Sequence, residues 1–195
     1  MRDYRLSLVR LALYGLLALS LLPVVMMILL SLKSNVEIIT DFWSWPNSIR
    51  WDNYPAAFAT VAGSTLNSLF VSLVSCAGIL LLSSLTGFVF ARHEFPGKEL
   101  LFSLLIALIM LPQVLLLVPL FIEIKSMGLD NSYWALILPY LSGGQLIGIL
   151  LCRGFFSTIP REFFESARID GASEFQIYGR IVLPLSLPIL TTVAI

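Results

Sequence analysis

The sequence predicts an all-α fold, a polytopic bundle of transmembrane helices with four full spans and part of a fifth. Apolar residues make up 58% of the 195 residues, and the mean hydropathy is +0.92. Charged residues make up only 12%, whereas a soluble domain carries roughly 25%. Four apolar stretches also run long enough, at ~20 residues, to cross a hydrocarbon core. A chain so poor in charge cannot cover a water-exposed surface, so we predict an integral membrane protein.

None of the four predicted spans contains Asp, Glu, Lys, Arg or His. They are Leu11–Leu32, Thr65–Ala91, Leu100–Ile122 and Tyr133–Cys152. A fifth apolar stretch begins near Ile181, and its rise of ~22 Å up to Ile195 is short of a ~30 Å hydrocarbon core. We therefore expect residues 1–195 to form a single transmembrane domain that is incomplete at its C-terminus.

The first span is expected to remain in the mature protein. Basic residues precede it, as in a signal peptide, but its apolar run is far longer than the roughly 7–15 residues of a signal-peptide core. No small-residue cleavage site follows Leu32. A retained transmembrane helix is therefore the better interpretation.

The distribution of Lys and Arg predicts the orientation of the bundle. Nine of these residues fall in the N-terminus and the alternate loops on its side, and three fall on the opposite side. Cytoplasmic loops carry the excess of Lys and Arg, so we predict a cytoplasmic N-terminus. Residues 33–64 then face outward, and Trp43, Trp45 and Trp51 there are expected to be aromatic anchors at the lipid headgroups. A docking surface for an external partner is the alternative.

Composition argues against several classes of protein. Lys plus Arg (12) equals Asp plus Glu (12), so no basic excess points to nucleic acid. One histidine and two cysteines are too few for an ordinary structural zinc site. We identify no nucleophile paired with a base, and we expect His93 to be a solvated loop residue. The prediction is therefore a non-enzyme without catalytic, metal-binding or cofactor-binding residues.

The spans carry features of helix packing rather than of ion coupling. Ionisable residues inside a membrane mark ion pathways, and their absence from the four spans suggests that energy for transport arrives from elsewhere. Small residues recur at helix-packing spacing, namely Ser68, Ser72, Cys76, Ser83, Gly87 and Ala91, and also Gly144 and Gly148. We expect close packing there, with a substrate path as the alternative. Pro112, Pro119 and Pro139 are expected to permit kinks.

The most informative segment is the charged loop 153–180, which we expect to be cytoplasmic. Pro160 can begin a short helix, because its missing N–H is not needed in the first turn. Positions i, i+3, i+4 and i+7 then form an apolar face of Pro160, Phe163, Phe164 and Ala167. This face is expected to dock a partner; an alternative is that it lies on the lipid surface.

A turn and a second helix are expected to follow. Asp170-Gly171 suits a turn that needs a positive φ. Ser173-x-x-Gln176 is a capping-box pattern, and the helix it opens would carry Phe175, Ile177 and Tyr178 into the membrane. A short helix joined in this way to a span would act as a handle on the cytoplasmic face.

This segment closely resembles the EAA loop of ABC importer permeases. The resemblance is carried by Glu165–Ala172 and by Ile181–Pro188, with its Leu-Pro and second proline. The flanks resemble the carbohydrate-uptake, MalG-like branch of the family. The matching stretches are Ala91–Lys98, Met127–Trp134 and Phe155–Pro160.

The resemblance implies a transmembrane permease subunit of an ATP-driven, binding-protein-dependent sugar importer. Such a subunit lies in the bacterial or archaeal plasma membrane and binds no cofactor itself, since ATP is held by partner ATPase subunits. The other implied partners are a second permease subunit, an extracytoplasmic solute-binding protein and membrane lipid. Family members complete a fifth and sixth span, which are expected to be missing here.

The resemblance also implies which residues couple this chain to the ATPase. They are Phe163, Phe164, Glu165, Ser166, Ala167, Asp170, Gly171 and Ala172. Within this set Glu165 would be the charged contact, Ala167 would allow close approach, and Asp170-Gly171 would form the turn. Ser166 departs from the family pattern, in which alanine is usual.

Two alternatives remain open. The permease could serve another solute class, such as polyols, glycerol phosphate or polyamines, or the chain could be a truncated membrane fragment without transport activity. Residues 141–145 spell Leu-Ser-Gly-Gly-Gln, the signature of ABC ATPase domains, but they lie within a span. The sequence also lacks a G-x-x-x-x-G-K-[ST] motif to cradle phosphates, so we expect no ATP hydrolysis by this chain.

Overall fold

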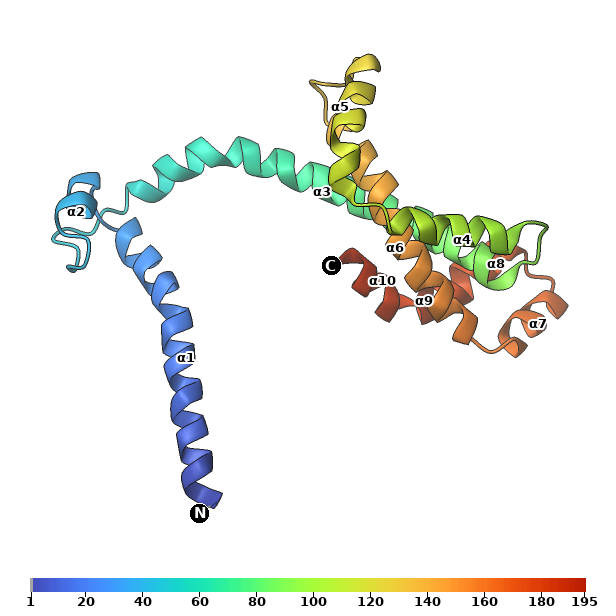
Figure 1. The fold of residues 1–195 in the computed structure, drawn as a ribbon, viewed down its shortest axis with the longest axis horizontal. Helices are drawn as coiled ribbons and strands as arrows, with labels where there is room; N and C mark the ends of the chain where they lie inside the picture. The colour runs from blue at the N-terminus through green and yellow to red at the C-terminus, as the bar shows by residue number, and fades with distance from the viewer. Residues whose placement is uncertain (1) are drawn as a thin grey trace. The chain divides into compact units, whose positions relative to one another are not determined.

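The computed structural model describes the backbone of residues 2–195 and the side chains from Val9 onward, and the regular elements within this part are all helices (Figure 1). The chain packs as two compact units, residues up to Leu66 and residues 67–195. Helix α3 (Asn53–Arg92) contributes to both. The units are described one at a time.

The first unit begins with α1 (Arg2–Ser31), which confirms a helix over the first predicted span. Apolar side chains are exposed around this helix, among them Leu11 at 70% and Leu19 at 66%. Exposure of such a surface to water is unfavourable, so the surface suits a lipid environment.

The segment between α1 and α3 is ordered by hydrogen bonds. Short helix α2 (Asn35–Thr40) starts with a capping box between Ser34 and Glu37, a pattern that our reading of the sequence did not identify. Lys33 is only 1% exposed, and its ammonium donates to the carbonyls of Asp41 and Phe42 and to the hydroxyl of Ser44. The burial cost of this charge is thereby offset.

The tryptophans of this segment point to its surface. Trp43 and Trp45 are each 78% exposed and Trp51 is 65% exposed. Exposed indole rings are compatible both with a lipid interface and with a partner surface. Helix α3 then begins at Asn53, before the predicted start at Thr65, and its 40 residues rise ~60 Å, about twice the thickness of a hydrocarbon core.

The second unit contains the rest of α3 and the shorter helices that follow it. These are α4 (Lys98–Ile109), η1 (Gln113–Leu116), α5 (Leu117–Ser126), α6 (Trp134–Thr158), α7 (Glu162–Ile169), α8 (Glu174–Ile177), the π-helical η2 (Tyr178–Val182), α9 (Leu183–Leu185) and α10 (Leu187–Ala194). Across the described residues, three helices are long and apolar enough to cross a membrane, or up to five if each of two bent pairs is one span.

The third predicted span is a bent pair of helices, which confirms the kink expected at Pro112. Helix α4 and the segment Gln113–Ser126 meet at a 90° bend. Pro112 lies in the break, where its missing N–H cannot continue the helical hydrogen bonds of α4. Pro119 causes no such break because it lies in the first turn of α5, where the N–H has no partner to lose.

The fifth apolar stretch is bent as well. Residues Glu174–Leu185 and α10 meet at 76°, with Ser186 between them. Pro188 lies in the first turn of α10. The stretch near Ile181 is therefore helical as predicted, but it changes direction midway.

Helices α3 and α6 approach closely at small residues, which confirms the packing prediction at these positions. A Cβ added at Gly87 would lie 2.6 Å from the Cβ of Cys152, and one at Gly148 would lie 2.7 Å from the Cβ of Ser83. Such distances leave no room for any side chain. Ser68 and Ser72, in contrast, are exposed and take no part in this packing.

Gly87→Val should destabilise the protein, because its side chain would overlap Cys152 and the backbone of α6. We expect the free energy of unfolding to fall by about 1–3 kcal/mol, the usual cost of overpacking, with a lower unfolding temperature in detergent. The matched control is Gly154→Val on α6, since no atom lies within 4 Å of a Cβ there. Equal stability of the two variants would contradict the close packing.

The ordered segment after α1 should respond to acid through Glu37. Hydrogen bonds from the backbone N–H groups of Ser34 and Asn47 lower the pKa of Glu37 below its ordinary value of 4.5. A lowered pKa in the folded state contributes stability that is complete above pH 4.5 and is lost as the pH falls through the lowered value. Tryptophan fluorescence of this segment should therefore change only below pH 4.5, and Glu37→Gln should remove that transition.

Candidate functional site

A buried apolar cluster joins four elements at one end of the second unit. Residues of α3, α6, α7 and the α8–η2 segment contribute to it. They are Phe88, Cys152, Phe156, Ile159, Phe164, Ile177, Tyr178 and Val182. The hydroxyl groups of Tyr178 and Ser84 share a hydrogen bond of 2.6 Å inside this cluster. The cluster therefore fastens the predicted coupling loop to the ends of the long helices.

Helix α7 begins later than predicted. Its first residue is Glu162, and the carbonyl of Arg161 accepts hydrogen bonds from the N–H groups of Phe164 and Glu165. Pro160 thus lies before the helix, and the expectation that it occupies the first turn is wrong. The proline still precedes the helix closely, and boundaries predicted from sequence commonly differ by one or two residues.

The turn after α7 confirms the predicted role of Gly171. Its φ is +79°, a conformation that is unfavourable for a residue with a Cβ. The N–H of Ala172 donates to the carbonyl of Ala167 at 2.9 Å, which closes the end of the helix. The predicted capping box also forms, with Ser173 and Gln176 exchanging hydrogen bonds at the start of α8.

The predicted apolar face of α7 is only partly correct. Phe164 is 3% exposed, and its ring stacks on Phe88 with 6.4 Å between centroids, whereas Phe163 is 50% exposed. The two residues are adjacent, and neighbouring side chains on a helix point about 100° apart. Phe164 therefore anchors α7 to the chain, and Phe163 is the aromatic side chain that remains accessible.

The other members of the predicted coupling set differ in exposure. Ala167 and Ala172 are half-buried against the apolar cluster. The exposed members are Glu165, Ser166, Asp170 and Gly171. The structure therefore brings the predicted residues together on one short helix and its turn, with an inner side that packs and an outer side that is free of the chain.

Arg92 holds α6 and α7 in place. Its guanidinium donates to the carbonyls of Phe156 and Ile159, at the end of α6, and lies 4.1 Å from the ring centroid of Phe164. The last carbonyls of a helix have no partner within it, and they attract a cation. From the sequence, Arg92 served only to predict the orientation of the bundle. Its position directly after an apolar span was the one sequence feature that pointed to a role at the helix ends.

A row of charged side chains links α7 to α8 and to the end of α3. Arg168 donates from Nε to the Glu174 carboxylate at 2.9 Å, and Nε2 of His93 lies 3.5 Å from the same carboxylate. His93 also packs edge-on against Phe88. The expectation that His93 is simply solvated is therefore wrong, because it is half-buried between α3 and α8.

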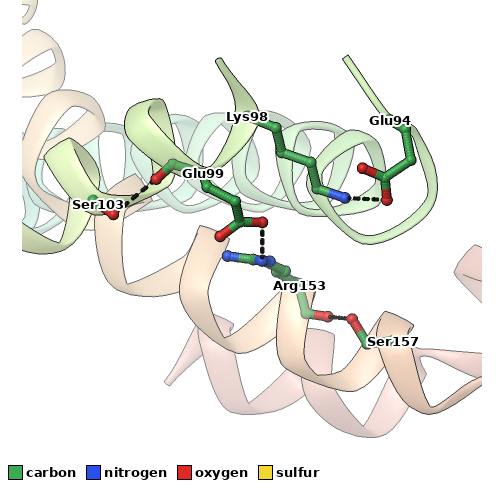
Figure 2. Close-up of polar contacts among 6 residues, drawn as sticks. All are labelled: Glu94, Lys98, Glu99, Ser103, Arg153 and Ser157. Carbon is green, nitrogen blue, oxygen red and sulfur yellow. Dashed lines mark hydrogen bonds and ion pairs between the residues drawn. The ribbon is translucent and has the colours of Figure 1, made fainter. Parts of the chain in front are cut away.

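Figure 2 shows how α4 is held against α6 near this site. Arg153 on α6 donates to the carboxylate of Glu99 on α4 at 3.3 Å, and its guanidinium lies 3.5 Å from the ring centroid of Phe102. Lys98 donates to Glu94 at 2.9 Å. This hydrogen bond and the Lys98 charge lower the pKa of the Glu94 carboxyl.

The described residues around α7 form a packed and hydrogen-bonded junction between helix ends. Within the residues searched, no group of three or more His, Cys, Asp or Glu side chains gathers to hold a metal ion. Residues 141–145 lie inside α6, where helical hydrogen bonds occupy the backbone N–H groups that a phosphate would need at a helix N-terminus. Helix α7 is packed against the ends of both α3 and α6.

Arg92→Gln should loosen the coupling loop, because the shorter amide cannot reach the two carbonyls and carries no charge. We expect the free energy of unfolding to fall by about 1.5–3 kcal/mol, the range for hydrogen bonds to charged groups, and faster hydrogen exchange in residues 159–172. Arg180→Gln is the control, since Arg180 is exposed. Unchanged exchange in the Arg92 variant would contradict the anchoring role.

Comparison with known proteins identifies the family. A family model described as "Binding-protein-dependent transport system inner membrane component" matches residues 79–195, more than half of the chain. The chain is 32% identical to the diacetylchitobiose uptake system permease protein NgcG of Streptomyces coelicolor, over 90% of this chain and 59% of that protein. It is 39% identical to the galactooligosaccharides transport system permease protein GanQ of Bacillus subtilis, over 76% of this chain and 54% of that protein.

A solved structure supports the fold. It belongs to a bacterial ABC transporter involved in the import of the acidic polysaccharide alginate, and the TM-score is 0.81 at 20% sequence identity. The match covers all of this chain and 69% of the chain in that structure. The chain thus spans less than two thirds of the length of the two relatives named above. It is a multi-pass membrane protein and belongs to the family of inner-membrane components of binding-protein-dependent transport systems.

Proposed function

We propose that this chain is part of a permease subunit of an ATP-driven, binding-protein-dependent sugar importer, in which α7 is the coupling helix. The observation that carries the proposal is the split between the two phenylalanines of α7. Phe164 is buried in the core and Phe163 is half exposed. A helix with one side anchored in its own chain and the other side accessible is suited to receive a force from a partner.

The path of that force runs through the anchors of α7. Phe164 rests on Phe88 of α3, and Arg92 links Phe164 to the end of α6. The close contacts at Gly87 and Gly148 allow little movement of α3 and α6 relative to each other. Movement of α7 is therefore passed to both long helices, rather than absorbed by a flexible loop.

The energy for transport is proposed to come from ATPase subunits that dock on α7. The four predicted spans contain no charged residue to couple an ion gradient. No Walker A sequence is present, and the Leu-Ser-Gly-Gly-Gln segment lies in the interior of α6. These features support a subunit that moves with ATP hydrolysis and does not itself perform it.

Sugars are the proposed substrate class. NgcG is named for diacetylchitobiose uptake and GanQ for galactooligosaccharide transport. The other proposed partners are an extracytoplasmic solute-binding protein and a second permease subunit. The N-terminus is proposed to be cytoplasmic, which is supported by the nine basic residues on its side against three on the other.

Glu165→Lys and Gly171→Pro should uncouple ATP hydrolysis from uptake in the complete transport complex. Glu165 is exposed on the outer side of α7, so reversing its charge should disturb the partner and leave the fold intact. Proline requires a φ near −65°, whereas Gly171 has +79°, so its substitution should reorient the turn. Sugar uptake into proteoliposomes should fall at least tenfold while both variants still insert in the membrane.

The matched control is Glu123→Lys, which makes the same charge change at an exposed position on α5. It should retain uptake. ATPase subunits should co-purify with the wild-type complex, which would identify them directly as partners of this chain. Full uptake by both coupling variants, or a wild-type complex without ATPase subunits, would contradict the proposed function.

A further inference from the structure

A small polar pocket lies between the end of α3 and α7. Its volume is about 190 Å³, and a buried phenylalanine forms part of its wall. The charged residues that line it are Arg92, Arg161, Arg168, Glu94 and Glu165. A pocket that holds one water needs only about 10–15 Å³ on this measure, so this one has room for a polar side chain of a partner.

The positive groups of this pocket are only partly neutralised by the chain itself. Arg92 uses its guanidinium on backbone carbonyls, and its Nε is buried without a hydrogen-bond partner. Arg161 takes part in no salt bridge or side-chain hydrogen bond with the residues whose side chains are described. Arg168 is already paired with Glu174, and Glu94 with Lys98, so Arg92 and Arg161 are left against Glu165.

The two guanidinium groups left in the lining, those of Arg92 and Arg161, favour an anion. Guanidinium groups bind carboxylates and phosphates through paired, charge-assisted hydrogen bonds. The two glutamates in the wall distinguish these ligands, because a phosphate would bring about two negative charges against them, whereas a carboxylate brings one. The charge balance therefore suits a single carboxylate.

We infer that this pocket receives the carboxylate of an Asp or Glu side chain of the ATPase subunit. The inference rests on the proposed function, since it names the chemistry of the partner that docks on α7. Phe163 and Glu165 on the outer side of α7 would contact the surface of the ATPase subunit. The acidic side chain of that subunit, held in the pocket, would fix its position along α7. Arg161 is the group through which the contact is formed, because it is exposed and otherwise uncommitted.

The test is the affinity of the permease for the ATPase subunit that co-purifies with it, measured in lipid nanodiscs over a range of salt concentrations. Arg161→Glu should weaken binding about tenfold or more, as reversal of one partner in a close charge pair does. Arg161→Lys should retain most of the affinity, and Arg161→Gln should lie between and show a weaker salt dependence. An Asp→Lys or Glu→Lys change on the ATPase surface should restore binding to Arg161→Glu.

Lys125→Glu is the matched control, because it changes the net charge equally at an exposed residue of α5 outside the pocket. Arg161→Gln and Arg161→Lys should unfold at the wild-type temperature, which separates a lost contact from a lost fold. Wild-type affinity of Arg161→Glu would overturn the inference while the proposed function stands. Weaker binding of Arg161→Glu to vesicles of anionic lipid, with unchanged ATPase affinity, would overturn it in favour of a lipid phosphate. A wild-type permease that binds no ATPase would overturn both.

Discussion

The guanidinium of Arg92 is the interaction on which the organisation of the site depends. It lies at the last residue of α3, binds the carbonyls of Phe156 and Ile159, and covers the ring of Phe164. One cation thus satisfies the open end of α6 and fixes the first turn of α7. Without it, those carbonyls and the linker between the helices would have no common attachment to α3.

This attachment has a mechanical consequence for the proposed function. Helix α7 has eight residues, too few to be stable alone in water, so its position is set by tertiary contacts. Its apolar contacts lie on its inner side, at Phe164 and Ala167, and Arg168 adds the ion pair with Glu174. In the proposed function, the outer side is the surface for the partner, and the close contact between α3 and α6 at small residues would carry a displacement onward. The short anchored helix would then act as a lever on the long helices.

Several site features were predictable because they are local. The positive φ of Gly171 follows from an Asp-Gly pair at the end of an amphipathic segment, and the Ser173 capping box follows from residues three positions apart. The exposure of Phe163 and the burial of Phe164 were not predictable, because the periodicity of α7 places both near one face. Which of them is buried depends on where α3 and α6 lie, and no local pattern contains that information. The same holds for His93, whose contact with Glu174 joins residues 81 positions apart.

The sequence by itself determined that this is a multi-span membrane protein with a charged loop between its last helices, because hydropathy and charge act on each segment independently. It also predicted the close contacts at Gly87 and Gly148, since only residues without bulk permit close approach, and the kink at Pro112. The tertiary structure alone decided the exposure of Ser68 and Ser72, the 76° bend, the role of Arg92 and the pocket lined by three arginines. Each of these depends on where separate helices meet, and the balance of packing and hydrogen bonding there belongs to the assembled unit and not to any one segment.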